Sequence, residues 1–271
     1  MSHNITVEGG TSVRLPTAGK YCDRDVVITA TGGTEDLNEV LTEQETLIAE
    51  LQDTLRGKAS GGTSQDYLAS RLNGTINTYK SEEVTTIPTY AFYGCKSLET
   101  IELPACKAID TACFTNCTSL KSVNFPSCTA MGGTVFRGCT SLTSVNMPLV
   151  KSSSTYVFAD CSSLKDIRLP EIEVVGGAMF HSCPLLEYAY LPNAKSIGAM
   201  TFQNCTSLSA VVIEQTKSIC TLAATTAFDG TPIASGTGFI YVPDTLVDRY
   251  KTETNWSTYA SQIKPLSELE V

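Results

Sequence analysis

The chain has 271 residues, with 28 acidic against 19 basic side chains and a formal net charge of −9. Binding to nucleic acid or to anionic lipid needs a basic face, so this balance argues against both as main partners. No apolar run reaches the roughly 18 residues of a transmembrane helix. The N-terminus lacks the charged and apolar regions of a secretory signal, so we predict neither membrane insertion nor a signal peptide.

Residues 1–33 predict a small β unit. Apolar residues alternate with polar ones in three short runs, as they do in half-buried strands. The alternating residues are Ile5 and Val7, Val13 and Leu15, and Val26 and Ile28. The Gly9-Gly10 pair predicts a turn between the first two runs.

Residues 34–57 predict an amphipathic helix. Thr34 suits its N-cap, and Glu35 and Asp36 suit the positive end of the helix dipole. The seam of the helix comprises Leu37, Leu41, Ile48, Leu51 and Leu55, with the polar Gln44 at one position. This alternating four-and-three spacing is typical of a short coiled coil.

A lone helix of that length is only marginally stable, so the seam needs a partner. The partner is either another copy of the chain or the rest of this one, and we expect self-association through residues 37–55, as a trimer or a dimer. Residues 58–66 are rich in Gly, Ser and Thr and predict a flexible linker.

A 22-residue repeat dominates the rest of the chain. Leucine and, in all but the last copy, proline keep the same period as the phenylalanines and cysteines. The recurring aromatic and cysteine positions are Phe92, Cys95, Phe114, Cys117, Phe136, Cys139, Phe158, Cys161, Phe180, Cys183, Phe202 and Cys205. A fixed period of about 20–29 residues is typical of stacked solenoids. We predict a mainly β solenoid over residues 67–242, with these residues as its structural ladder.

Within each copy, the apolar spacing changes along the repeat. Phe92, Cys95, Leu98 and Ile101 follow one another at steps of three, which predicts a tight, 3₁₀-like segment. A step of two from Ile101 then predicts a short strand, which the following proline ends. A further apolar column stands five residues before each Phe, and Ser153 interrupts it, so we expect the fourth turn to be looser.

The C-terminal segment departs from the repeat. Phe228 follows Phe202 after 26 residues, and residues 239–243 predict a last strand. Residues 243–271 predict a helical cap over the end of the solenoid, with Asp244 as an N-cap. Its large apolar residues are Leu246, Val247, Tyr250, Trp256, Tyr259 and Ile263.

Six of the eleven cysteines occupy one repeat position, and Cys106 and Cys128 share another. Stacked cysteines point the same way, whereas a disulfide needs specific Cβ directions. We therefore predict reduced, buried thiols that pack as small apolar groups. A structural zinc site is the alternative, but it needs close clusters such as C-x-x-C, which a 22-residue ladder does not supply.

The Phe-x-x-Cys-x-x-Leu-x-x-Ile-x-Leu-Pro runs resemble the treponemal-type leucine-rich repeats of BspA-like proteins, over roughly residues 67–266. The resemblance implies a right-handed leucine-rich-repeat solenoid with a curved strand face. It also implies the role of many members, which are bacterial surface proteins that bind host proteins or other cells. Residues 4–33 resemble N-terminal segments of tail-associated proteins in prophages of gut Firmicutes.

No residue pattern indicates catalysis. The two histidines are His3, near the terminus, and His181, beside the ladder residue Cys183. A Cys–His pair would need an accessible thiol of low pKa, and a ladder cysteine faces the core. The sequence has no P-loop, G-x-S-x-G or H-E-x-x-H motif. We therefore expect no enzyme activity, no cofactor and no metal.

The outward strand positions carry the functional signal. The early copies present small polar residues, and the later ones present charged, aromatic and apolar residues, Val212 among them. Exposed aromatic residues with Arg are typical of binding hot spots, and an exposed apolar patch is typical of a contact site. The candidate ligand-binding residues are Asp166, Arg168, Tyr188, Tyr190, Phe239 and Tyr241. The same composition also fits strand formation alone, because Tyr and Val favour strands, or a C-terminal segment that folds over these side chains.

The sequence therefore predicts a non-enzymatic recognition or attachment protein that binds a cell-surface protein or glycan through its strand face. Two settings fit this role: a component of a phage tail, or a host-encoded bacterial surface adhesin. The expected location is accordingly the virion tail or the bacterial cell surface after release. An enzyme with its site in the N-terminal unit or on the strand face is a third possibility.

Light scattering of the full chain tests the coiled-coil prediction. We expect a mass of two or three copies, because the apolar seam over residues 37–55 is too short to be stable unpaired. A strictly monomeric chain would mean that this seam packs within its own copy.

Overall fold

The computed structural model describes residues 3–7, 11–15, 29–30 and 77–269. Strands β1 (His3–Val7) and β2 (Thr11–Leu15) pair antiparallel and contain the first two predicted runs, whereas the predicted turn at Gly9-Gly10 lies outside the described residues. Strand β3 (Thr29–Ala30) pairs parallel with β1 and begins just after the predicted third run. That run, the predicted coiled coil of residues 34–57 and the linker of residues 58–66 lie outside the described residues.

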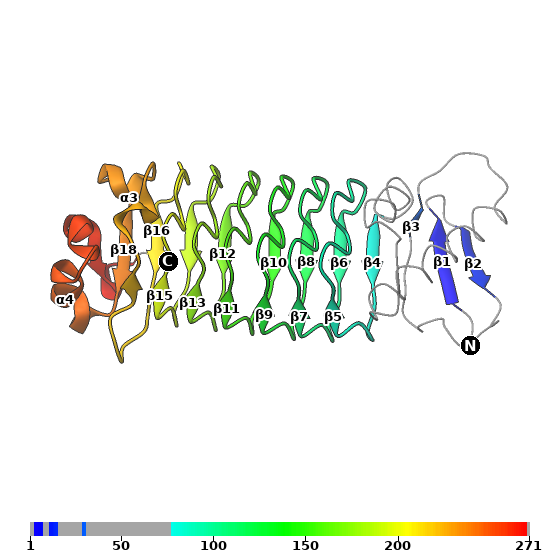
Figure 1. The fold of residues 1–271 in the computed structure, drawn as a ribbon, viewed down its shortest axis with the longest axis horizontal. Coiled ribbons are helices and arrows are strands. Elements are labelled where there is room, and N and C mark those ends of the chain that lie inside the picture. The colour runs from blue at the N-terminus through cyan, green and yellow to red at the C-terminus, as the bar shows by residue number, and fades with distance from the viewer. Residues whose placement is uncertain (1–2, 8–10, 16–28, 31–76, 270–271) are drawn as a thin grey trace.

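The repeats form a solenoid with two parallel strand faces (Figure 1). The front face begins with β4 (Thr78–Lys80), β6 (Thr100–Glu102), β8 (Ser122–Asn124) and β10 (Ser144–Asn146). It continues with β12 (Asp166–Arg168), β14 (Tyr188–Tyr190), β16 (Ala210–Val212), β18 (Phe239–Val242) and β19 (Ile263–Pro265). The front strands thus confirm the predicted mainly β solenoid and place the candidate residues on one face.

The back face is a sheet of seven two-residue strands, which the repeat pattern did not predict as strands. They are β5 (Thr86–Ile87), β7 (Ala108–Ile109), β9 (Ala130–Met131), β11 (Ser152–Ser153), β13 (Val174–Val175), β15 (Ser196–Ile197) and β17 (Thr221–Leu222). The second residue of each strand is buried, and in all but β17 it belongs to the apolar column five residues before each Phe. Ser153 fits this column because its hydroxyl lies 3.1 Å from Met179 Sδ and accepts a hydrogen bond from Gly176 N.

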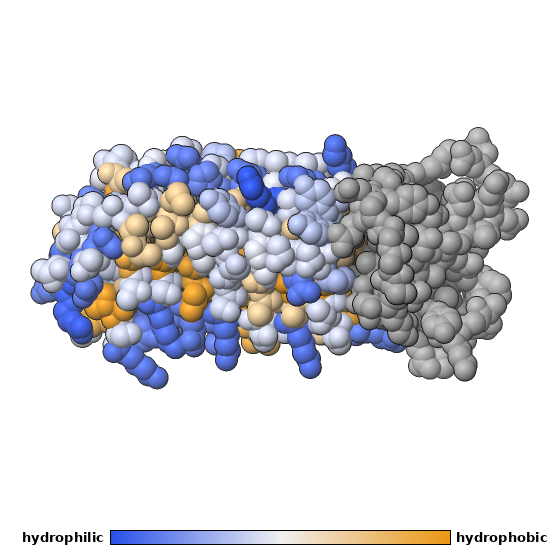
Figure 2. Space-filling model, viewed as in Figure 1, coloured by the Kyte–Doolittle hydropathy of each residue, from blue (hydrophilic) through white to orange (hydrophobic). Residues whose placement is uncertain are grey.

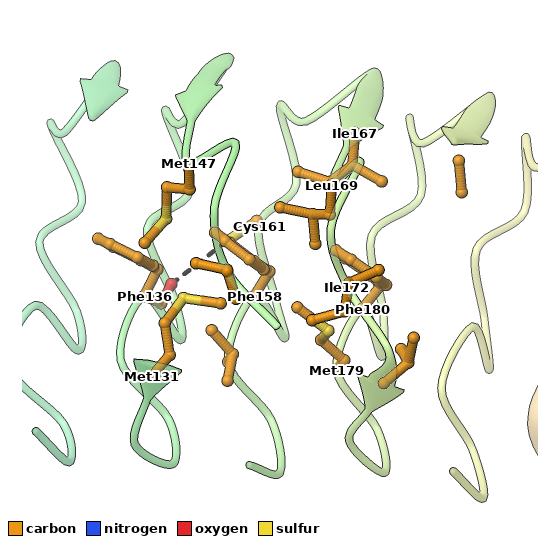
Figure 3. Close-up of a cluster of buried hydrophobic side chains, with 14 of the residues drawn as sticks. Met131, Phe136, Met147, Phe158, Cys161, Ile167, Leu169, Ile172, Met179 and Phe180 are labelled. Carbon is orange, nitrogen blue, oxygen red and sulfur yellow. Dashed lines mark hydrogen bonds between the residues drawn. The ribbon is translucent and has the colours of Figure 1, made fainter. Parts of the chain in front are cut away.

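Seven phenylalanine rings, from Phe92 to Phe228, stack along the core. Neighbouring ring centroids lie 5.0–5.6 Å apart, and neighbouring ring planes differ by only 4–13°. Figure 3 shows part of this column, with Met131, Met147 and Met179 filling the space beside the rings. The backbone reinforces the stack, because the N–H of each Phe before the last donates to a carbonyl one turn further on, as Phe136 N does to Val157 O at 2.8 Å.

The cysteine column ties each turn to the previous one. The thiols of Cys117, Cys139, Cys161, Cys183 and Cys205 each donate to the carbonyl of the Phe 25 residues earlier, with S···O distances of 2.9–3.2 Å. For the first four of these thiols, that carbonyl also accepts the N–H of the cysteine in its own turn, so the thiol uses the remaining lone pair of a buried oxygen. Cysteine is thus small and apolar but still a donor.

The ten cysteines within residues 77–269 are free and buried, as predicted. Burial raises the pKa of the thiols of Cys139 and Cys161 well above the ordinary value, and it raises the pKa of Cys128 to about 11. Thiolates are the reactive form, so these side chains stay protonated, apolar and inert at neutral pH.

The segment with three-residue spacing is a chain of tight turns. Hydrogen bonds from residue i+3 to residue i are present, as from Cys95 N to Phe92 O at 3.0 Å. Two residues per turn are left-handed, such as Ala112 and Asn116 at φ 56° and 61°. A left-handed residue ends helical propagation, so the predicted 3₁₀-like segment does not become a helix.

The C-terminal segment closes the core with short helices: η1 (Thr225–Phe228), α3 (Pro232–Ser235), η2 (Asp244–Leu246), α4 (Val247–Thr252), η3 (Trp256–Gln262) and η4 (Leu266–Glu268). Trp256 covers Phe228 at a centroid distance of 6.2 Å, and its indole N–H donates to Cys220 O. The predicted capping role of Asp244 is wrong, because its carboxylate accepts from Ser267 N. Strand β19 was not anticipated. No helix in the described part of the chain is long and apolar enough to span a membrane.

Replacing Phe158 with alanine should destabilise the solenoid by about 3–5 kcal/mol, because it leaves a cavity between two stacked rings. Urea unfolding followed by circular dichroism measures the change. Leu185→Ala is the control, since Leu185 is 44% exposed and should change stability by less than about 1 kcal/mol. Equal effects of the two substitutions would contradict the stacked-core account.

Candidate recognition surface

The six candidate residues lie on neighbouring parallel strands of the front face. One row across β12, β14, β16 and β18 contains Asp166, Tyr188, Ala210 and Phe239, and the next contains Arg168, Tyr190, Val212 and Tyr241. Neighbouring strands lie about 4.8 Å apart. The two tyrosines on β14 are therefore two strands away from Phe239 and Tyr241 on β18. We call these two rows the aromatic surface.

Arg168 lies close to the other three candidates on β12 and β14, so the four residues form one cluster. Its guanidinium carbon lies 5.0 Å from the ring centroid of Tyr188 and 5.8 Å from that of Tyr190. Its Nε lies 4.0 Å from the Asp166 carboxylate, and the two side chains are 63% and 60% exposed. A cation over a ring face is held by the ring quadrupole, while both charged groups keep most of their contact with solvent.

A second cation stands at the other end of the aromatic surface. Lys264 on β19 pairs in register with Tyr241, and its ammonium lies 5.7 Å from the ring centroid of Phe239. Lys264 also forms an ion pair with Glu268 at 2.9 Å. The Phe239 and Tyr241 rings meet edge to face at 6.4 Å. Sequence reasoning missed Lys264 because nothing in the repeat pattern predicted β19.

The middle strand, β16, provides a small apolar floor between the aromatic pairs. Ala210 is half-buried, and Val212 is fully buried. The expectation that Val212 is exposed is therefore wrong, because it lies between Tyr190 and Tyr241, whose larger side chains shield it.

Partial burial raises the pKa of Tyr188, and the Arg168 charge acts in the opposite direction. Partial burial and the nearby Glu214 carboxylate both raise the pKa of Tyr190. Both phenols therefore stay protonated at neutral pH and can donate a hydrogen bond as well as accept one. Glu214 stands where the other repeats have proline, a departure visible in the sequence.

The C-terminal cap leaves most of this surface open. Tyr250 and Trp256 pack on Cys220 and Phe228 at the end of the core, and β19 extends the sheet at its far edge. The four aromatic side chains of the surface are half-buried, neither covered nor fully exposed. In Figure 2 the visible side of the solenoid is mostly hydrophilic, and its larger hydrophobic patches lie in the C-terminal half.

The front sheet is interrupted beside the surface. Strands β10 and β12 are consecutive front strands, but no ladder pairing joins them in the described chain. Val145, in β10, is only half-buried, whereas the equivalent Val123 and Ile167 are buried. The looser fourth turn was expected from Ser153 on the opposite face, but β11 pairs with both of its neighbours. The loosening lies on the front face instead.

The ladder residues take no part in a surface site, since all twelve are buried in the core. His181 is half-buried; its Nδ1 lies 3.0 Å from the Ser182 hydroxyl, and its ring lies 6.3 Å from that of Tyr156. Among residues 77–269 and the N-terminal strands, no group of three His, Cys, Asp or Glu side chains is placed to hold a metal ion.

These features define a parallel β-solenoid with a rigid front face and one aromatic, charged cluster on it. The protein family described as BspA type leucine rich repeat region matches this chain in six copies, over residues 85–209 and 150–235. The match covers more than half of the 271 residues, and the chain belongs to this family.

Solved structures share the fold. A leucine-rich repeat protein of T. pallidum aligns at a TM-score of 0.52 and 24% identity, over 57% of this chain and 76% of that one. A leucine-rich repeat protein from Eubacterium ventriosum aligns at 0.52 and 26% identity, over 58% of this chain and 43% of that one. No curated protein matches the chain.

Hydrogen exchange tests the interruption of the front sheet. Amides of residues 165–168 should exchange faster than those of residues 187–191, because β12 lacks the ladder to β10, whereas the latter donate to neighbouring turns, as Tyr188 N does to Lys165 O and Leu191 N does to Val212 O. Mass spectrometry of the exchanged peptides resolves these segments. Equal protection in the two regions would show that β10 and β12 are joined in solution.

Proposed function

We propose that this chain is a non-enzymatic recognition and attachment protein that binds a cell-surface protein or glycan through its front face. The observation that carries the proposal is the cluster of Asp166, Arg168, Tyr188 and Tyr190 on two adjacent strands. Arg and Tyr are among the residues most enriched in binding hot spots. The rigid sheet beneath them holds their positions without the entropy loss of ordering a loop.

The chemistry of the described residues supports binding over catalysis. The thiols in residues 77–269 are buried, and none is paired with an activating base. His181 stands beside Ser182 and Tyr156, away from the candidate residues. Several exposed charges form isolated pairs across neighbouring turns, such as Lys121–Glu99 and Lys195–Glu173.

The biological setting has two candidates. The BspA-type repeats favour a bacterial surface adhesin, as the resemblance of the repeats implies. The resemblance of residues 4–33 to prophage tail proteins favours a phage tail component. In either setting, self-association through residues 37–55 would present several front faces to one target cell and raise the avidity. Neighbouring genes for tail and lysis proteins, or for surface anchoring, separate the two.

Substituting both Tyr188 and Tyr190 with alanine should weaken attachment to target cells at least tenfold, because it removes the two rings that Arg168 orders. The melting temperature should fall by only a few degrees, since both side chains are half-exposed. Flow cytometry of the labelled full chain on a panel of bacterial cells measures attachment.

The double substitution Tyr90→Ala with Tyr93→Ala is the matched control. These two tyrosines also form a ring pair, with centroids 5.6 Å apart, and Tyr90 is 41% exposed. The control should bind as the unaltered chain does. Unchanged attachment by the Tyr188 and Tyr190 variant would remove the basis for the proposed front-face site.

A further inference from the structure

At each end of the aromatic surface, a cationic side chain lies against aromatic rings. Arg168 comes from β12 and lies against Tyr188 and Tyr190, whereas Lys264 comes from β19 and lies against Phe239. Each cation therefore approaches its aromatic pair from the outer side of the five-strand sheet. The strand order leaves the inner side of both pairs facing β16, with half-buried Ala210 as the floor between Tyr188 and Phe239.

This arrangement disfavours a charged ligand. A ring that already holds a cation attracts a second cation only weakly, because the two positive charges repel. The positive charges are also compensated: Arg168 lies near Asp166, Lys264 pairs with Glu268, and Glu214 stands beside the tyrosines. The surface therefore has two cations against three carboxylates, on a chain whose net charge is −9.

The size of the aromatic surface favours a small ligand over a protein interface. The aromatic pairs are two strands apart, or about 10 Å, and the residues of each pair are about 7 Å apart along the strand. A stable protein interface buries about 800 Å² on each partner around an apolar core. The large exposed hydrophobic side chains of residues 77–269 lie outside these rows, at Tyr90, Leu149, Val174 and Leu185.

We propose that the aromatic surface binds a neutral carbohydrate; this inference rests on the proposed recognition function and specifies its ligand. The C–H faces of a sugar ring carry slight positive charge and pack on the negative faces of aromatic rings. The hydroxyls of the sugar need acceptors and donors at the edge, which the exposed Asp166 carboxylate and Arg168 guanidinium provide. The tyrosine hydroxyls can do both.

A glycan array containing neutral hexose and N-acetylhexosamine oligosaccharides, with sialylated and sulfated chains alongside, tests the inference on the full-length chain. Binding to neutral oligosaccharides is expected, with affinity nearly independent of salt because no net charge is neutralised. Tyr188→Ala with Tyr190→Ala should reduce the affinity at least tenfold in calorimetry, and Tyr90→Ala with Tyr93→Ala should leave it unchanged. A preference for acidic chains, or neutral binding that survives loss of Tyr188 and Tyr190, would overturn the inference.

Attachment to cells treated with periodate or with protease distinguishes failure of this inference from failure of the proposed function. Periodate cleaves the vicinal diols of sugars, so it should abolish the attachment that depends on Tyr188 and Tyr190, whereas protease treatment should leave it. Attachment that resists periodate but is lost after protease would refute the carbohydrate ligand while leaving front-face recognition intact. Attachment that never depended on the two tyrosines would refute both.

Discussion

Each turn of the solenoid stacks in register on the next, and the ring column, the thiol hydrogen bonds and the outward rows all follow from this packing. One turn cannot bury its own Phe, Leu and Ile side chains, so each turn shields the apolar face of the next. The rings stack at 5.0–5.6 Å, close to the spacing of neighbouring strands. In each repeat, the Phe ring, the Cys thiol and the Phe backbone N–H therefore all contact groups of a neighbouring turn.

This constraint turns the outward strand positions into a surface with a fixed spacing. The core leaves those positions free, so residues 22 apart in sequence become neighbours on one face. In β8 and β10 they are small and polar, as in the Asn146–Asn124 pair at 2.7 Å, and in β4 and β6 Lys80 and Glu102 form an ion pair at 2.7 Å. From β12 onward they become charged and aromatic, and the ladder between β10 and β12 is interrupted where the composition changes. The front face thus has two chemically distinct parts.

Most of the fold was predictable because the spacing of apolar residues within each repeat shows which side chains enter the core. The Phe and Cys columns and most of the front strands were found from spacing alone, whereas Phe228 continues the ring stack although it stands out of period, 26 residues after Phe202. The back-face strands were missed because two residues give no alternation to detect. Strand β19 and Lys264 were missed because they belong to no repeat. Val212 was placed outward correctly, but its burial depends on the tyrosines on neighbouring strands.

The solenoid, the reduced cysteine ladder and the composition of the front face can be read from the amino-acid sequence, because a 22-residue period sets which side chains stack. The assembly of the aromatic surface is visible only in three dimensions. Arg168 reaches both tyrosines, Lys264 reaches Phe239, and the cap leaves the rows between them open. These contacts join strands far apart in the chain, and contacts between side chains of different turns depend on geometry that no local pattern encodes.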